Sequence, residues 1–255
     1  MKPRGRWGQA LIAGSILACL AAVVALAAMQ RPALYEIGAY TTSFRYRDPE
    51  QRENALRAAA ALDGLVLPPG AEFSYNRSVG PWTADRGFRK APVSFDGHLL
   101  PSFGGGVCQT STTLYNAALL AGLTVVERHR HAWCPKYIAP GLDAAVAQPD
   151  IDLRLRNPYP FPLTLRAAGD ADTLRVRILA PERVAPARIA TVVRAVDPED
   201  SVVRTGYKRP HLQVPGQPGV RVEVQRITAG RAGERRELIS RDTYPPVTRV
   251  VALPD

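Results

Sequence analysis

The chain has 255 residues, of which 46% are hydrophobic and 22% are charged, and its formal net charge is +10 at pH 7. This balance is typical of a globular protein with a core of one or two domains, and it excludes a disordered chain. Because the basic residues are scattered and no nucleic-acid motif is present, we expect attraction to an anionic envelope polymer and no nucleic-acid partner.

The N-terminal segment, residues 1–32, is typical of a membrane anchor or a signal segment. Lys2, Arg4 and Arg6 precede an uncharged run over residues 11–29, which is long enough to cross a bilayer as a helix. Basic residues on this flank place the N-terminus inside the cell by the positive-inside rule. The sequence therefore predicts a single-pass transmembrane helix and an extracytoplasmic main domain, with or without cleavage of the helix.

The next stretch predicts short alternating elements. Residues 34–46 alternate weakly and indicate a strand, and Asp48 with Pro49 suits the start of a helix that continues to Gly64. Two short strands around a proline–glycine turn follow. Residues 78–102 carry glycines and aromatic side chains without a regular period, so they are a candidate for one wall of a groove.

Residues 103–131 contain the motif on which the functional hypothesis is built. Three consecutive glycines lead into Cys108, and the residues after it predict an amphipathic helix that ends at Gly122. A thiol at a helix N-terminus has a lowered pKa and is partly thiolate, which is the nucleophilic form. In the strand expected next, alternation places His129 and His131 on one face.

This order of residues suggests a catalytic triad. Cys108 is the candidate nucleophile, His131 or His129 is its base, and Asp143, in a second strand, orients the imidazole. The backbone N–H of Cys108 and the side chain of Gln109 are candidates for stabilising an oxyanion. Cysteine on a helix followed by histidine and aspartate on strands resembles the arrangement in transglutaminase-like and papain-like thiol enzymes.

Successive motifs between about residues 43 and 166 resemble the VanW family. They include residues 68–76, 87–91, 104–117, 127–131, 137–144 and 156–157. The resemblance implies a bacterial cell-envelope protein, in a family named after an accessory member of vancomycin-resistance clusters, and it implies no particular reaction. We therefore expect a membrane-anchored envelope protein, with the residues above pointing to a thiol-dependent hydrolase or acyl or peptidyl transferase acting on envelope amides or esters.

The C-terminal half predicts antiparallel strands. Residues 151–157, 163–167 and 173–179 alternate, and further strands are expected after a boundary rich in proline and acidic residues. Because helices come early and strands late, we predict an α+β fold in which an antiparallel sheet packs against the central helix.

Three domains are expected. Residues 1–32 are the anchor or signal segment, residues 33–180 the VanW-like domain, and residues 181–255 a β-rich extension. The extension either completes the VanW-like domain or forms a small binding module. It resembles the all-β, glycine-marked domain that often follows VanW segments, and this resemblance implies binding to envelope polysaccharide.

Three alternatives stay open. Cys108 and Cys134 can form a disulfide if both lie in an oxidising compartment. The chain can instead be a non-catalytic scaffold that binds peptidoglycan or another anionic glycan. His129 and His131 can also bind a metal with Cys108 or Asp143, but their spacing fits no recurrent metal motif, and we expect no cofactor.

Overall fold

The computed structural model describes most of the chain from residue 33 onward. The described residues are 33–95, 98–196, 202–205, 211–214, 216, 218–230 and 233–253. Residues Tyr35–Asp255 form one compact unit, and the candidate site lies within it.

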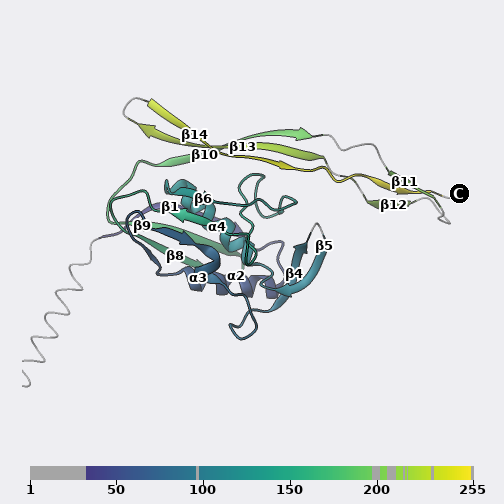
Figure 1. Ribbon diagram of the computed structural model, residues 1–255, viewed down its shortest axis with the longest axis horizontal. Helices are drawn as coiled ribbons and strands as arrows, with labels where there is room; N and C mark the ends of the chain where they lie inside the picture. The colour runs from purple at the N-terminus through teal and green to yellow at the C-terminus, as the bar shows by residue number, and fades with distance from the viewer. Residues whose placement is uncertain are drawn as a thin grey trace, which may run out of the picture. The chain divides into compact units, whose positions relative to one another are not determined.

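A four-stranded antiparallel sheet and two helices surround the main core (Figure 1). The strand order is β1 (Tyr35–Ser43), β9 (Thr173–Ala180), β8 (Leu163–Gly169) and β2 (Val66–Leu67). Helix α2 (Pro49–Leu62) contacts β8 and β9, and helix α4 (Val107–Leu120) contacts β1 and β9. Leu174, Val176 and Ile178 alternate along β9 and are fully buried, so this face of the sheet belongs to the core.

Helix α4 approaches strand β1 closely because small residues line the contact. Ala117 and Ala121 are fully buried. A Cβ at Gly38 of β1 would lie 2.5 Å from the carbonyl oxygen of Ala117, so only glycine fits at this position. This contact fixes the position of the helix that carries Cys108.

Shorter elements connect the core to the rest of the unit. Strands β3 (Glu72–Ser74), β7 (Arg154–Arg156) and β6 (Thr124–Glu127) form one small sheet, and α3 (Tyr75–Val79) follows β3. Strands β4 (Lys90–Phe95) and β5 (His98–Phe103) form a hairpin. Because β5 ends at Phe103, this hairpin leads directly into the glycine turn before α4.

The C-terminal strands form two further sheets. Strands β10 (Ala187–Val196), β13 (Gly219–Gly230) and β14 (Gly233–Tyr244) are antiparallel, and Figure 1 shows β13 and β14 side by side over their length. A smaller sheet contains β11 (Val202–Arg204), β15 (Val250–Ala252) and β12 (His211–Val214). In β14, Ile239 is an extra residue, since Ser240 pairs with Val224 and Leu238 pairs with Gln225.

The face of this sheet that carries Tyr244 is buried. Val222, Val224 and Tyr244 form a small hydrophobic cluster, against which Leu142 and Cys134 pack. Strand β14 therefore contacts the segment that follows the two histidines.

The predicted α+β fold, with an antiparallel sheet packed on a central helix, is wrong as a description of the protein. Among the described residues 45% are in strands and 17% in helices, so the protein is mostly β. The strands in the part of the chain that the structure describes form five sheets. The physical reason is that β10, β13 and β14 are long strands, of which β10 and β13 are rich in β-branched residues, and they pair with one another to form a sheet of their own.

The transmembrane helix predicted over residues 11–29 lies outside the described residues. Within the ranges that the structure describes, no helix is both long enough and apolar enough to span a membrane. This part of the predicted fold class is therefore not supported.

Candidate functional site

A glycine turn, residues 104–106, sets the start of helix α4. Gly104 and Gly106 have φ angles of 83° and 106°, a region that residues with a Cβ rarely adopt. Gly106 is the N-cap residue, and a Cβ there would collide with the backbone carbonyl of Gln51 in α2. The turn therefore packs directly on α2 and places Cys108 in the first turn of α4.

Buried polar side chains hold this turn to α2. Asn54, which is fully buried, donates hydrogen bonds to the carbonyl oxygens of Gly105 and Arg89, both at 2.9 Å. Thr110 donates to the carbonyl oxygen of Ala55 at 2.9 Å. Because buried hydrogen bonds of this kind are costly to break, the helix start has one defined position.

Cys108 is a partly exposed, free thiol at that helix start. The N–H groups of a first helical turn lack intrahelical acceptors and carry partial positive charge. Within the described residues, the backbone N–H of Cys108 makes no hydrogen bond, whereas the Cys108 Sγ lies 3.4 Å from the carbonyl oxygen of Val146. Cys134 is also free, so the two cysteines do not form the disulfide that the sequence left open.

The segment after β6 places His131 opposite Asp143. His129 forms an antiparallel bridge with Ala145, whose N–H donates to the His129 carbonyl at 2.8 Å. Two residues after His129 and two residues before Ala145, the Nδ1 atom of His131 lies 2.7 Å from Oδ2 of Asp143. Asp143 thus lies in hydrogen-bonding contact with His131, and its role in orienting the imidazole stays a prediction.

The Asp143 carboxylate is fully buried and accepts hydrogen bonds from three further donors besides the imidazole. The backbone N–H of His131 donates to Oδ2 at 2.6 Å, and Nη2 of Arg128 donates to Oδ1 at 2.8 Å. The phenol of Tyr244, at the end of β14, also donates to Oδ1. A buried carboxylate needs such partners to remain ionised.

The three groups shift one another's pKa values. Burial disfavours the ionised form of Asp143, but the hydrogen bond from His131 and the charge of Arg128 outweigh burial and lower the pKa of Asp143. Burial also disfavours the imidazolium, yet Asp143 and Cys108 raise the pKa of His131 to about 9. For Cys108, burial is outweighed by the hydrogen bond to His131 and its charge, so the pKa of Cys108 is lowered. Both shifts favour a thiolate beside an imidazolium more than free cysteine and histidine side chains would.

His129 does not take part in this arrangement. Its side chain is 44% exposed, and its Nε2 lies 2.9 Å from Oε1 of Glu127. Among the predicted residues, the structure therefore brings together Cys108, His131 and Asp143, and it leaves His129 at the surface.

The side chain of Gln109 is fully buried and bonded to other protein groups. Its Nε2 donates to Oγ1 of Thr42 and to the carbonyl oxygen of Ser43, each at 3.0 Å. Its Oε1 accepts from Nε of Arg47 at 2.7 Å. The guanidinium of Arg47 lies over the ring of Tyr137, 4.4 Å from its centre. In this conformation Gln109 holds Arg47 in place.

Several residues of the site escaped the sequence analysis. Arg128 donates to Asp143 and, through Nη1 at 2.6 Å, to Asp242 of β14. Arg128 lies within the VanW motif at 127–131, which also contains His129 and His131, so its place in this motif was a signal that could have identified it as a site residue. Asp242 and Tyr244 carry no local sequence signal, because they meet Asp143 only through the tertiary fold.

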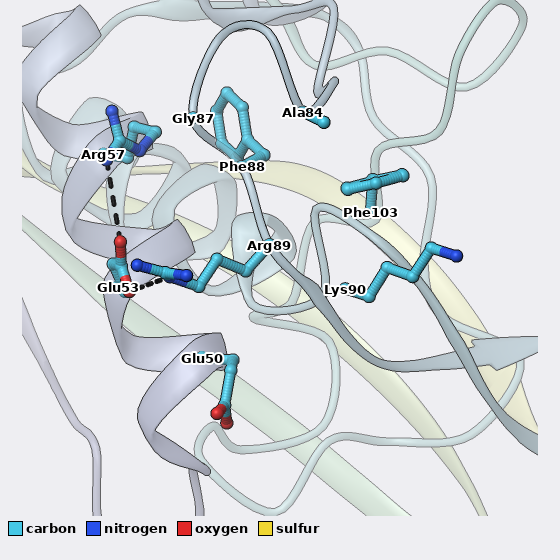
Figure 2. Close-up of a pocket in the computed structure, with 9 residues that line it drawn as sticks. All are labelled: Glu50, Glu53, Arg57, Ala84, Gly87, Phe88, Arg89, Lys90 and Phe103. Carbon is cyan, nitrogen blue, oxygen red and sulfur yellow. Dashed lines mark hydrogen bonds and ion pairs between the residues drawn. The ribbon is translucent and has the colours of Figure 1, made fainter.

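A separate surface hollow of about 640 Å³ lies between α2 and β4. Figure 2 shows that charged side chains line it, with Glu53 paired to both Arg57 and Arg89. Phe88 and Phe103 contribute its aromatic surface. The lining includes neither the thiol nor the imidazole, so this hollow is distinct from the candidate site.

The metal alternative finds no support in the arrangement of ligands. In the part of the chain that the structure describes, no group of three or more His, Cys, Asp and Glu side chains is placed to hold a metal ion. The imidazole of His131 is instead engaged by Asp143.

A family model described as VanW like protein matches residues 50–179, which include Cys108, His131 and Asp143. The chain is 38% identical over 132 residues to the uncharacterized protein YoaR of Bacillus subtilis, covering 52% of this chain and 44% of that protein. It is 33% identical over 110 residues to the vancomycin B-type resistance protein VanW of Enterococcus faecalis, covering 41% of this chain and 40% of that protein. The chain thus spans less than half the length of these curated relatives.

One solved structure, described as the crystal structure of HP0197-G5, also matches part of the chain. It is 15% identical, and the match covers 26% of this chain and 93% of that one. Its TM-score of 0.18 is too low to indicate a shared fold.

Proposed function

The chain belongs to the VanW-like protein family, and we propose that it is a thiol-dependent hydrolase or acyl transferase acting on amides or esters of the bacterial cell envelope. One observation carries the proposal: Nδ1 of His131 lies 2.7 Å from Oδ2 of Asp143, and this imidazole lowers the pKa of the Cys108 thiol at the start of α4. Nucleophile, base and orienting carboxylate in this order are the parts that thiol acyl transfer requires.

In the first half-reaction, the Cys108 thiolate attacks the carbonyl carbon of the substrate and forms a C–S bond. The carbonyl oxygen takes the negative charge of the tetrahedral intermediate. As this intermediate collapses, the bond to the leaving amine or alcohol breaks, and the His131 imidazolium donates its proton to the leaving group. The product is a thioester on Cys108 and a neutral imidazole.

In the second half-reaction, water or an amine attacks the thioester. Neutral His131 accepts the proton of the attacking group, and the C–S bond breaks to restore the thiolate. Water gives hydrolysis, and an amine gives transfer to a new partner. Asp143 remains ionised and keeps the imidazole oriented throughout both steps.

The backbone N–H of Cys108 is the proposed donor to the oxyanion, because it has no other partner within the described residues and lies at the positive end of α4. Gln109 contributes indirectly by fixing Arg47. The charge of Arg47 lowers the pKa of Cys108, although burial, His131 and Val146 each have a larger effect on this pKa. Positive charge beside the thiol favours an anionic intermediate.

The substrate is proposed from the family context. A relative of this chain is named vancomycin B-type resistance protein VanW, and membership of the VanW family supports a cell-envelope context for this chain. We infer that this chain acts outside the cytoplasm, on peptidoglycan or another anionic envelope polymer. The net charge of +10 favours association with such a polymer.

Selective alkylation of the full chain tests the thiol chemistry. Burial raises the pKa of Cys134 to about 11, with a contribution from Asp143, so Cys134 is an internal control of opposite character. With iodoacetamide at pH 6, Cys108 should react at least about tenfold faster than Cys134, as followed by peptide mass mapping. Equal or slower reaction of Cys108 contradicts the proposal.

The acyl-enzyme provides a second test. Incubation with purified peptidoglycan fragments should add a fragment mass to the wild-type chain and none to Cys108→Ala. Cys134→Ala, the matched control, should keep the adduct. An adduct that persists in Cys108→Ala rules out Cys108 as the nucleophile.

Binding of an anionic polymer without catalysis is a second candidate function, favoured by one feature of the C-terminal sheet. Arg194 of β10 and Arg221 of β13 are both exposed and directly opposite one another in register. Like charges in this position destabilise a sheet, and a bound anion would relieve the repulsion. Cosedimentation with purified sacculi should weaken in an Arg194→Gln/Arg221→Gln variant and persist in Cys108→Ala. Unchanged cosedimentation of the double arginine variant argues against this role for the sheet.

A further inference from the structure

We propose that strand β14 is part of the catalytic apparatus, with Tyr244 and Asp242 acting as positioning residues for the His131–Asp143 pair. The inference rests on the proposed thiol chemistry and extends it, because β14 lies beyond residues 50–179 that the family model matches. The C-terminal extension would then complete the site chemically.

Tyr244 provides the direct contact. Its side chain is buried, at 3% exposure, and its hydroxyl donates to Oδ1 of Asp143. The same hydroxyl accepts the backbone N–H of Gly141 at 2.9 Å. Since the phenol oxygen is fixed by Gly141, its proton is directed at the carboxylate. One carboxylate oxygen of Asp143 therefore contacts β14, and the other contacts His131.

Asp242 provides an indirect contact through Arg128. The Arg128 side chain is 5% exposed and donates to Asp143 at 2.8 Å and to Asp242 at 2.6 Å. Asp242 is itself fixed by a hydrogen bond from Ser240 at 3.0 Å. With two carboxylates sharing one guanidinium, only part of the Arg128 charge is compensated by Asp143. The remaining negative charge of Asp143 is available to stabilise the imidazolium of His131.

Other charged and titratable groups surround this network. Arg130 lies over the ring of Tyr244, with 5.5 Å to its centre, and Arg128 lies at the same distance from the ring centre of Tyr115. Cys134 is close enough for Asp143 to raise its pKa further, in addition to burial. On the thiol side, His131 faces Cys108, with Arg47 and Tyr137 nearby. Asp242 is the group that adds negative charge to the Arg128 side of this network.

Packing alone does not account for these side chains. Val222, Val224 and the Tyr244 ring form the apolar contact, and phenylalanine would satisfy it equally well. The hydroxyl of Tyr244 and the carboxylate of Asp242 are instead the atoms that reach Asp143 and Arg128. Their placement two residues apart puts both on one face of β14.

Tyr244→Phe tests the direct contact in the full chain. Removing a hydrogen bond to the ionised form makes Asp143 protonate at higher pH, and the imidazolium then loses its partner during acidification. The acid limb of the iodoacetamide alkylation profile of Cys108 should move up by about one pH unit. Tyr159→Phe is the matched control, since Tyr159 donates to the carbonyl oxygen of Ala121 instead, and its profile should match the wild type.

Asp242→Asn tests the indirect contact and should move a different group. With one negative charge removed, more of the Arg128 charge acts on Asp143, so the imidazolium is less stabilised. The NMR titration midpoint of His131 should fall by about half a pH unit or more. Glu223→Gln, which removes a charge paired with Arg241 on the same sheet, should leave the midpoint unchanged.

The results distinguish the two proposals. If wild-type Cys108 alkylates like an ordinary thiol, the proposed thiol chemistry fails. If wild-type Cys108 is reactive but neither the acid limb nor the His131 midpoint moves in the variants, the role of β14 is overturned, even when thermal stability drops. If Tyr244→Phe does not fold, the His131 midpoint in Asp242→Asn decides the matter.

Discussion

The two ends of the proposed triad are held by different kinds of interaction. The backbone around Cys108 is held by neutral hydrogen bonds: Tyr137 donates to the Cys108 carbonyl at 3.2 Å, and Ser111 of the same helix turn donates to the carbonyl of Ala144 at 2.6 Å. Around Asp143 the contacts are charged and reach across to β14. Backbone packing thus fixes the thiol, whereas electrostatics fixes the imidazole. Substitutions at the first end should mainly change stability, and those at the second should mainly change reactivity.

Replacing His131 should produce the largest effect and break the charged end. His131→Ala removes the cation that lowers the pKa of Cys108, so alkylation by iodoacetamide at pH 6 should slow by about 100-fold or more. His129→Ala, the matched control, should change the rate by less than about twofold, because His129 pairs with Glu127 at the surface. Equal losses in the two variants would show that the structure assigns the base to the wrong histidine.

Replacing Gly106 should break the neutral end. Gly106→Ala adds a Cβ at a positive φ of 106° and against the Gln51 carbonyl, so the free energy of unfolding should fall by about 2–4 kcal/mol. Gly64→Ala also has a positive φ, 82°, but meets nothing within 4 Å, and should cost only about 1 kcal/mol. Urea unfolding measures both. Equal costs would contradict the close packing of the turn on α2.

The pH dependence of stability should reveal the coupling between the two ends. Near neutral pH the folded state holds a proton on His131, whose pKa is raised from 6.5 to about 9, whereas the lowered pKa of Cys108 makes the folded state release a thiol proton more readily than the unfolded state. These two effects on the number of bound protons oppose one another, so the unfolding free energy of the wild type should depend less on pH between 6.5 and 9 than it would with His131 alone.

Cys108→Ala should uncover the contribution of His131. Asp143 still raises the pKa of the imidazole, and this stabilisation is fully present below the unfolded pKa of 6.5 and is lost as the pH rises through the folded pKa. Urea unfolding at pH 6, 7.5 and 9 should show a loss of about 1–2 kcal/mol across the range. A variant as insensitive to pH as the wild type would argue against the ion pair.

The smallest effect is expected for a charge outside both ends. Glu223 and Arg241 form an ion pair at 2.8 Å whose side chains are 42% and 70% exposed. Glu223→Gln should change the unfolding free energy by less than about 0.5 kcal/mol and leave alkylation of Cys108 unaltered. A larger effect on alkylation would mean that charge anywhere on the C-terminal sheet influences the site.

The residues that meet in the site could be predicted where the signal is local. Cys108 follows a glycine turn and starts a helix, and Asp143 follows His131 by twelve residues on a paired segment. The choice between His129 and His131 could not be made, because alternation places both on one face. It is decided by the bridge from His129 to Ala145, which carries His131 to Asp143.

The remaining contacts depend on tertiary structure. Tyr244 and Asp143 are 101 residues apart in the chain, and Arg128 and Asp242 are 114 residues apart. No periodicity within β14 indicates which residue it will meet. The fold class was misjudged for a similar reason, since local patterns located strands without showing that β10, β13 and β14 would form a separate sheet.

The bulge at Ile239 makes the orientation of Asp242 and Tyr244 depend on the number of residues in the β13–β14 hairpin. Strand β13 pairs with β14 from Gly230–Gly233 to Val220–Tyr244. The extra residue changes which side chains of β14 face each side of the sheet from Ser240 to Tyr244. One residue more or fewer in that hairpin would turn Arg241 and Thr243 inward and carry the carboxylate and phenol to solvent. An insertion or deletion in the hairpin, far from the thiol, would then remove the contacts to Asp143 and Arg128. A C-terminal extension exchanged between relatives would function only if the number of residues between the hairpin turn and the tyrosine were preserved.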